Sequence, residues 1–374
     1  MRRRIWHVAV LALTLAVVAA ACTREQPAPE GQGGGGGTEA GGAQQGVNLL
    51  AEIQERGTLR CGVNNTVPGF GFETAEGTIE GFDVDFCIAI AAALFGTDSP
   101  EEGTHYELVP IDADNRFTAL RAGEYDVLVR NTTWTSSRDG TEGVQFTKVN
   151  FYDGQAMIAP AANVSSIEDL DGATICVTAG TTTELNLADY FREQGLDFEP
   201  LTLEDYDQIF QAFRQERCDA VTGDRSALAS LAPTWSEDIG ELTILEDVMS
   251  KEPLTPAVLE GDANWHDVVF WVTNGLILAE ELGVTQDNVQ QEAQNPSTPG
   301  IAALLGAPFA EDEEVNVAHG LELDDTFMQN AIAAVGNYGE IFDRNIGPDT
   351  EIGLERGLNA LWTEDGLQYA IPFR

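Results

Sequence analysis

Short apolar runs alternate with amphipathic runs along residues 59–224. Runs rich in branched apolar side chains predict buried strands at residues 59–63, 106–110, 126–129, 173–178, 198–203 and 219–224. Apolar residues with helical spacing predict helices that open at 81–85 or span 116–122, 184–194 and 206–217. Strands that alternate with helices indicate an α/β fold built on mostly parallel sheets.

The same order of elements occurs twice, first in residues 59–129 and again in residues 173–224. The chain from residue 47 onward is also too long for one typical hydrophobic core. We therefore expect two lobes, each with a mostly parallel sheet flanked by helices.

A run of hydroxyl and amide side chains follows the predicted strand at 126–129 and ends at an arginine. The run is Asn131-Thr-Thr-Trp-Thr-Ser-Ser-Arg138. Open α/β sheets bind ligands in the crevice outside the carboxyl ends of their strands, and the planar fork of Arg138 suits a carboxylate. The alternative is a polar turn that caps the next helix and leaves Arg138 solvated.

The second half of the pattern has polar groups at comparable positions. The segment Gly180-Thr-Thr-Thr183 offers backbone N–H groups and hydroxyls after the strand at 173–178, although a plain helix N-cap explains it equally well. Asp224 ends the strand at 219–224. An arginine and an aspartate held apart across a cleft fit a small zwitterion, because each buried charge needs a partner.

The formal net charge of −43 at pH 7 argues against nucleic acid as a partner, since phosphate neutralisation needs clusters of basic residues. Histidines are isolated and no CxxC spacing occurs, so neither a metal site nor a cofactor is predicted. With Cys22 set aside, four cysteines remain, and an exported chain could pair them in three ways. They are Cys61, Cys87, Cys176 and Cys218.

The first residues predict export. Three arginines precede an apolar run at 8–21, which is shorter than a membrane span, and small residues lead to Cys22. A cysteine directly after the cleavage site resembles a bacterial lipoprotein signal, with residues 1–21 removed and Cys22 lipidated. Plain secretion is the alternative. Residues 22–46 are rich in glycine and predict a flexible tether.

Several motifs together resemble the extracellular solute-binding proteins of polar amino-acid uptake, family 3 of the ABC-transporter binding proteins. They are Gly57-Thr-Leu-Arg-Cys-Gly-Val63, Gly81-Phe-Asp-Val-Asp85, Phe117-Thr-Ala-Leu-Arg-Ala-Gly-Glu-Tyr-Asp126, Arg138, Gly180-Thr-Thr-Thr183 and Asp224. Four further segments resemble the general L-amino-acid branch of that family. These are Arg130-Asn-Thr-Thr-Trp-Thr135, residues 180–190, Gly336-Asn-Tyr-Gly-Glu-Ile-Phe342 and Gly357-Leu-Asn-Ala-Leu-Trp362.

The resemblance implies roles for the matching residues. Arg138 matches the arginine that binds the ligand α-carboxylate, assisted by Thr133 and by the segment that contains Thr181 and Thr182. Asp224 matches the carboxylate that receives the α-ammonium group. Asn131 matches a position that hydrogen-bonds the ligand.

One position departs from the family pattern. The aromatic residue that stacks on the ligand in the family aligns with Val67 in this chain. We expect Phe70 or Trp134 to form the apolar wall instead, with a core role as the alternative for Trp134. Without the stacking residue, we expect broad specificity, centred on the α-amino and α-carboxylate groups.

The resemblance also implies a two-lobed periplasmic-binding-protein type II fold with two crossing hinge strands. We expect lobe 1 at 47–155 and 250–374, lobe 2 at 156–249, and hinge segments near 152–159 and 249–258. An insertion near 284–323 has no assigned role. Disulfides are expected within lobes, as Cys61–Cys87 and Cys176–Cys218, because a bond between lobes opposes hinge opening.

The function implied is capture of L-amino acids for an ABC permease by a monomer outside the cytoplasm, without chemistry. One alternative is an amino-acid sensor for a signalling receptor. Another is a dehydratase-like enzyme on the same fold, which requires a general acid or base without a charge partner in the cleft.

Overall fold

The computed structural model describes residues 48–309 and 321–373. The predicted signal peptide at 1–21, the lipidated Cys22 and the tether at 22–46 lie outside the described residues, as do residues 310–320 of the predicted insertion. No helix of the described part combines the length and the apolar character that crossing a membrane requires.

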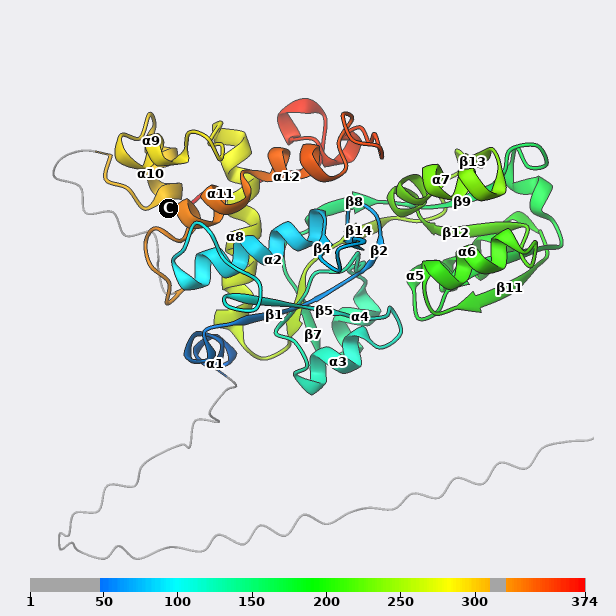
Figure 1. The fold of residues 1–374 in the computed structure, drawn as a ribbon, viewed down its shortest axis with the longest axis horizontal. Helices are drawn as coiled ribbons and strands as arrows, with labels where there is room; N and C mark the ends of the chain where they lie inside the picture. Colours follow the sequence, from blue (N-terminus) through cyan, green and yellow to red (C-terminus); the bar gives the residue numbers. More distant parts are fainter. Residues whose placement is uncertain (1–47, 310–320, 374) are drawn as a thin grey trace, which may run out of the picture. The chain divides into compact units, whose positions relative to one another are not determined.

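Two five-stranded sheets form the centres of two lobes (Figure 1). In spatial order the first contains β5 (Tyr106–Pro110), β1 (Leu59–Val63), β6 (Val127–Leu128), β15 (Ala257–Leu259) and β7 (Val144–Phe146). The second contains β11 (Phe198–Leu203), β10 (Ala173–Thr178), β12 (Ala220–Asp224), β9 (Gln155–Pro160) and β13 (Leu242–Ile244). Within each sheet only one strand, β15 or β9, runs against the others. The expected α/β fold with mostly parallel sheets is confirmed.

The two antiparallel strands are those that the chain enters after passing between the lobes. The chain leaves the first sheet through β8 (Phe151–Asp153) and returns through β14 (Glu252–Leu254), and these two strands pair antiparallel. Their register places Asp153 opposite Glu252. A further small sheet contains β2 (Thr66–Val67), β3 (Gly71–Glu73) and β4 (Ile79–Glu80).

Helices cover both sheets (Figure 1). Those of the second lobe are α5 (Thr182–Gln194), α6 (Tyr206–Arg214) and α7 (Arg225–Ile239). Those of the first are α1 (Leu49–Arg56), α2 (Phe82–Phe95), α3 (Arg116–Ala122), α4 (Ser136–Thr141), α8 (Ala263–Leu282), α9 (Val289–Gln294), α10 (Pro299–Leu305), α11 (Phe327–Val335) and α12 (Tyr338–Asn345). The largest core packs α2, α8 and α11 against the first sheet.

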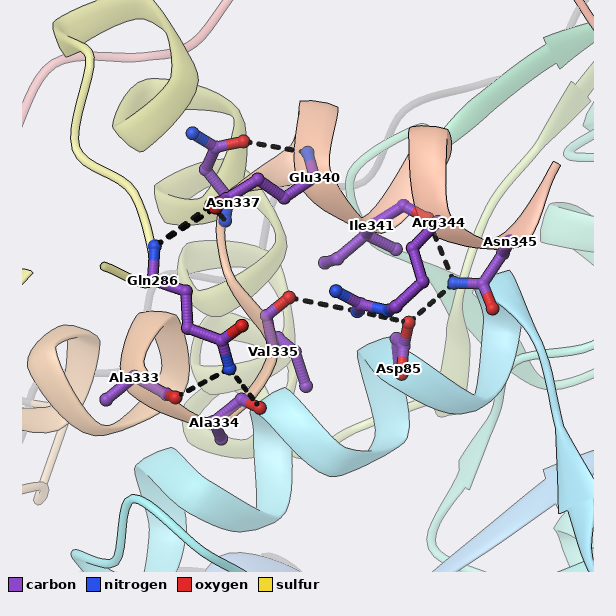
Figure 2. Close-up of polar contacts among 10 residues, drawn as sticks. All are labelled: Asp85, Gln286, Ala333, Ala334, Val335, Asn337, Glu340, Ile341, Arg344 and Asn345. Atoms are coloured by element: carbon purple, nitrogen blue, oxygen red, sulfur yellow. Dashed lines mark hydrogen bonds and ion pairs between the residues drawn. The ribbon is translucent and has the colours of Figure 1, made fainter. Parts of the chain in front are cut away.

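The described part of the predicted insertion belongs to this core. Its helices α9 and α10 contribute buried Val289 and Leu304. Figure 2 shows how Gln286 ties the segment to the α11–α12 junction: its Nε2 donates to the carbonyls of Ala333 and Ala334, at 3.0 and 3.1 Å. The segment therefore stabilises the first lobe.

The predicted opening of a helix at 81–85 is confirmed, but neither Asp83 nor Asp85 caps it. The helix begins at Phe82, and the N-cap is Gly81, without a capping side chain. Asp85 instead accepts hydrogen bonds at 2.6 Å from Arg344 and Asn345 of α12 (Figure 2). Both aspartates lie inside the helix, where they are free for tertiary contacts.

Both disulfides lie within a lobe. Cys61 of β1 is bonded to Cys87 of α2, and Cys176 of β10 is bonded to Cys218, just before β12. This is the pairing expected from the sequence, and it leaves the connection between the lobes free of covalent cross-links among these cysteines.

Candidate ligand-binding site

A cavity lies where the polar ends of β6 and β10 face each other across the two lobes. Six residues predicted for the site line it: Asn131, Thr133, Arg138, Thr181, Thr182 and Asp224. Its wall also includes Asn64, Thr66, Val67, Ala113, Arg116, Arg130, Thr178, Thr183, Asp205, Tyr206 and Ala227. In the described part of the chain, no cluster of histidine, cysteine and acidic side chains has a metal-binding arrangement.

Arg138 is held in the wall by its own helix. Thr135 caps α4 and accepts a hydrogen bond from the Arg138 backbone at 3.2 Å. The side chain is only 9 % exposed, its Nη1 donates to the Thr133 carbonyl at 2.9 Å, and its guanidinium lies over the Phe117 ring. The polar turn therefore caps a helix and also buries the arginine, so the alternative of a solvated Arg138 is wrong.

Asp224 ends β12 of the second lobe, lines the same cavity and makes no capping hydrogen bond to α7. Burial raises the pKa of Asp224 well above its usual value, and the nearby carboxylates of Asp153 and Glu252 raise it further. The guanidiniums of Arg116 and Arg138 oppose that rise. A ligand ammonium group beside Asp224 would favour its ionised form.

The threonines divide between structural and cavity-facing roles. Thr181 caps α5 by accepting from the Glu184 backbone at 3.1 Å, and its own hydroxyl donates to the Thr178 carbonyl at 2.7 Å. The N-cap interpretation of Thr181 is therefore correct, although the residue also lines the cavity.

Thr133 and Thr182 meet at a buried carboxylate that the sequence did not single out. Both hydroxyls donate to Oε2 of Glu252, at 2.5 and 2.8 Å, and Asn186 donates to Oε1 at 2.9 Å. Glu252 lies on the crossing strand β14 and is 1 % exposed. A residue of lobe 1 and two residues of lobe 2 thus share one hinge carboxylate.

Asn131 keeps a hydrogen-bond donor available. Its backbone has a left-handed φ of 35°, and its N–H donates to Asp83 at 3.0 Å. Its side-chain Nδ2 is buried and has no acceptor among the described residues. This geometry is compatible with the expected hydrogen bond to a ligand.

From the raised pKa of Asp83 we predict that the stability of the folded protein depends on pH. Burial raises the pKa of this carboxyl to about 7, above the ordinary value of about 3.9. At pH values between these two pKa values, this carboxyl is protonated more in the folded state than in the unfolded state. The free energy of unfolding therefore falls as pH rises, by at most about 1.4 kcal/mol per pH unit. Asp83→Asn is expected to make this fall shallower in thermal unfolding of the ligand-free protein from pH 4 to 8. The exposed Asp343→Asn is the control, and equal slopes for Asp83→Asn and the parent would contradict the assignment.

Neither aromatic candidate lines the cavity. Phe70 is fully buried and packs edge-on against Phe82 and Phe151, with ring centroids 5.9 and 5.2 Å apart. Trp134 is 40 % exposed and stacks on Phe146. The prediction of an apolar wall from either residue is wrong for this arrangement, as is the core role for Trp134. Tyr206 is the aromatic residue in the wall.

Two further arginines line the cavity and were not predicted as site residues. Arg116 is the first residue of α3, and Arg130 follows β6. A signal was present for Arg116, because a cation in the first turn of a helix opposes the helix dipole. The sequence also carried a signal for Glu252, because strand alternation places it on the same face of β14 as buried Leu254.

Residues 59–269 match the model of the bacterial extracellular solute-binding proteins, family 3. The chain is 44% identical over 335 residues to the general L-amino acid-binding periplasmic protein AapJ of Rhizobium johnstonii, covering 89% of this chain and 95% of that protein. It is 45% identical over 328 residues to the glutamate/glutamine/aspartate/asparagine-binding protein BztA of Rhodobacter capsulatus, covering 87% and 94%. A solved ABC-transporter periplasmic binding protein from Brucella ovis, with glutathione bound, has a TM-score of 0.81 and 43% identity, covering 88% of this chain and 100% of that one. The chain belongs to the bacterial extracellular solute-binding proteins of family 3.

Proposed function

We propose that this chain is the substrate-binding component of an ABC importer, which captures L-amino acids by closure of two lobes and delivers them to a membrane permease. The observation that carries the proposal is the pair Arg138 and Asp224, which line one cavity from different lobes. An α-carboxylate neutralises the arginine, and an α-ammonium neutralises the aspartate. One zwitterion therefore satisfies the buried arginine and the partly buried aspartate only when it contacts both lobes.

The relatives support this ligand class. AapJ is named for general L-amino-acid binding and BztA for glutamate, glutamine, aspartate and asparagine. The Brucella ovis structure holds glutathione, a tripeptide whose γ-glutamyl end carries the same α-amino and α-carboxylate groups. Free amino acids and γ-glutamyl peptides are thus the ligands to compare first.

The proposed closure uses β8 and β14 as the hinge, between lobe 1 at 47–155 and 250–374 and lobe 2 at 156–249. Glu252 sits at this hinge and accepts hydrogen bonds from Thr133 of lobe 1 and Thr182 of lobe 2. A ligand that contacts both lobes favours the closed form by its differential affinity for that form. Glu252 contributes by holding the two threonines together.

The proposed location is outside the cytoplasm, in keeping with a family of extracellular proteins. We propose that Cys22 is lipidated and that residues 22–46 tether the lobes to the membrane. Mass spectrometry of the protein isolated from membranes tests this: a diacylglycerol-modified Cys22 is expected at the mature N-terminus. Cys22→Ala is expected to release the protein into the soluble fraction.

A thermal-shift screen tests the binding function. The parent is expected to be stabilised by L-amino acids, since a ligand bound only by the folded state raises the unfolding temperature. The screen includes all common L-amino acids, their N-acetyl derivatives and glutathione. Asp224→Asn keeps the side-chain shape and removes the charge, so it should lose most of the shift. Tight binding of N-acetyl amino acids, or no shift with any amino acid, would contradict the proposal.

Two rival functions give different results. A sensor binds the same ligands as an importer component. Uptake of a radiolabelled amino acid by the host is unchanged when the gene of a sensor is deleted, and it is lost when the gene of an importer component is deleted. A dehydratase consumes its substrate, and prolonged incubation followed by mass analysis of the ligand detects that loss.

A further inference from the structure

Three arginines line the cavity, and all three are buried. Arg116, Arg130 and Arg138 are 2 %, 8 % and 9 % exposed. A buried guanidinium stays charged, and removing it from water is costly unless it is paired. The partners of these three side chains therefore decide what charge the cavity requires of a ligand.

The three arginines have only backbone carbonyls as hydrogen-bond acceptors among the described residues. Arg130 donates from Nε to the Ile111 carbonyl at 2.6 Å. Arg116 and Arg138 reach the same Gly180 carbonyl, at 3.3 and 3.5 Å. The Nε of Arg116 is buried and has no acceptor among the described residues.

Most described arginines elsewhere in this acidic protein are paired with carboxylates. Such pairs are Arg60–Asp126 at 2.8 Å, Arg344–Asp85 at 2.6 Å and Arg356–Glu280 at 3.0 Å. None of the ion pairs between described residues includes a cavity arginine. The chain has 62 acidic residues, so carboxylates are not scarce. Outside the cavity, only the exposed Arg217 and the partly buried Arg225 among the described arginines also lack an ion pair. In the described part of the chain, the buried arginines without a carboxylate partner are those of the ligand cavity.

Carboxylates near the cavity act on these arginines without pairing with them. Burial lowers the pKa of Arg130, and the carboxylates of Asp112 and Asp83 oppose this. Burial also lowers the pKa of Arg138, and the carboxylates of Glu252 and Asp224 oppose this. Asp205 caps α6 and accepts hydrogen bonds from Gln208. Asp224 is the proposed partner of the ligand ammonium. Burial lowers the pKa of Arg116 well below its usual value, and the guanidiniums of Arg138 and Arg130 lower it further. The like charges therefore act on one another, and a second anion would relieve their repulsion.

We propose that Arg116 and Arg130 form an anion subsite beside Arg138, so that the protein prefers L-amino acids that carry a second carboxylate. The inference rests on the proposed function and names its preferred ligand class. Arg138 takes the α-carboxylate, Asp224 takes the α-ammonium, and the second carboxylate lies toward Arg116 and Arg130. The Phe117 ring supports the arrangement, since both Arg116 and Arg138 lie over it, at 5.1 and 5.4 Å from its centroid.

Glutamate and glutamine are the decisive probes, because they have nearly the same shape and differ in charge. Calorimetry at physiological salt, with the full chain, is expected to show glutamate bound at least about tenfold more tightly than glutamine. Arg116→Gln and Arg130→Gln each remove one cation and are expected to bring the ratio close to one, while glutamine still binds. The control is Arg121→Gln on the same helix as Arg116, whose side chain is 40% exposed and paired with Glu142; it should keep the parent ratio.

The ratio of the glutamate affinity to the glutamine affinity is insensitive to a loss of folded protein, because both affinities are measured on the same variant. A change in this ratio therefore reports recognition of the ligand. A parent that binds glutamine as tightly as glutamate overturns the proposal, as does a ratio unchanged in both Arg116→Gln and Arg130→Gln. The third probe, 2-oxoglutarate, has two carboxylates and no ammonium. If neither amino acid binds but 2-oxoglutarate binds and Arg116→Gln weakens it, the amino-acid function fails and the anion subsite stands. If none of the three binds, the subsite is overturned too.

Discussion

Replacing Arg138 with alanine is expected to remove most of the affinity for L-amino acids. The guanidinium is buried in the cavity wall and has no carboxylate within ion-pair distance among the described residues. Truncating one side of a desolvated charge pair typically costs about 2–5 kcal/mol, which is roughly 30-fold to several thousand-fold in Kd. Calorimetry with the best ligand of the thermal-shift screen measures the loss.

Arg138→Lys is expected to restore little of the affinity. A lysine supplies a point charge, but it cannot reproduce the two parallel hydrogen bonds of a guanidinium to a carboxylate. Arg121→Ala is the matched control, because this arginine is 40% exposed in an ion pair with Glu142, and exposed pairs contribute little. If Arg138→Ala binds as well as the parent, another cavity arginine holds the α-carboxylate.

Loss of folding would not explain the expected result. Arg138→Ala removes a buried cation that repels Arg116, since Arg138 is among the groups that lower the pKa of Arg116. Against this gain stand the lost hydrogen bonds to the Thr133 and Gly180 carbonyls, the lost attraction to Glu252 and Asp224, and the lost contact with Phe117. We therefore expect the ligand-free variant to keep an unfolding temperature close to that of the parent.

Six of the ten strands in the two sheets could be predicted from the sequence because buried parallel strands are short, branched and apolar. The strands β9 and β15 were expected only as parts of the crossing segments, and the edge strands β7 and β13 were not predicted. The prediction was correct to the residue for β1, β5, β10 and β11. It was less accurate where polar residues continue an element. The helix α5 begins at Thr182, two residues before the predicted start, because Thr181 caps it. The helix α6 ends at Arg214, three residues before the predicted end.

Arg138 and Asp224 could be found because each follows or ends a predicted strand, where the fold class places ligands. Arg116 and Glu252 could not be assigned in the same way. Arg116 reaches the cavity from the start of α3, and Glu252 reaches the threonines from the crossing strand β14. Their positions depend on how distant segments pack, and the order of elements along the chain does not determine that packing.

Phe70 was predicted as a site residue, but the structure places it in the core. The loop at 64–70 has a polar, turn-like composition, which predicts a surface position beside the ligand. In the structure this segment forms β2 and a tight turn, and Phe70 enters the core beside Phe82 and Phe151. The surrounding glycines permit it: a Cβ on Gly81 would lie 2.5 Å from the backbone of Phe70. Local composition did not reveal that contact.

Replacing Gly180 with alanine is expected to impair closure of the lobes. Gly180 has a left-handed φ of 68°, and a Cβ at this position would lie 2.7 Å from Cα of Asp114 in lobe 1. A backbone atom cannot move aside as the end of a side chain can, so the lobes would have to stay further apart. Arg116 and Arg138 would then lose their shared Gly180 acceptor.

Gly172→Ala is a matched control for this substitution. Gly172 also lies in the second lobe and has a left-handed φ of 76°, but an added Cβ there meets nothing within 4 Å. Both substitutions carry the same backbone cost of about 1–2 kcal/mol, so they should lower the unfolding temperature to a similar extent. Only Gly180→Ala is expected to weaken ligand binding, by at least about tenfold, because a ligand held by Arg138 and Asp224 needs both lobes at their closed distance. Equal affinities for the two variants would show that contact between Gly180 and Asp114 is not required for binding.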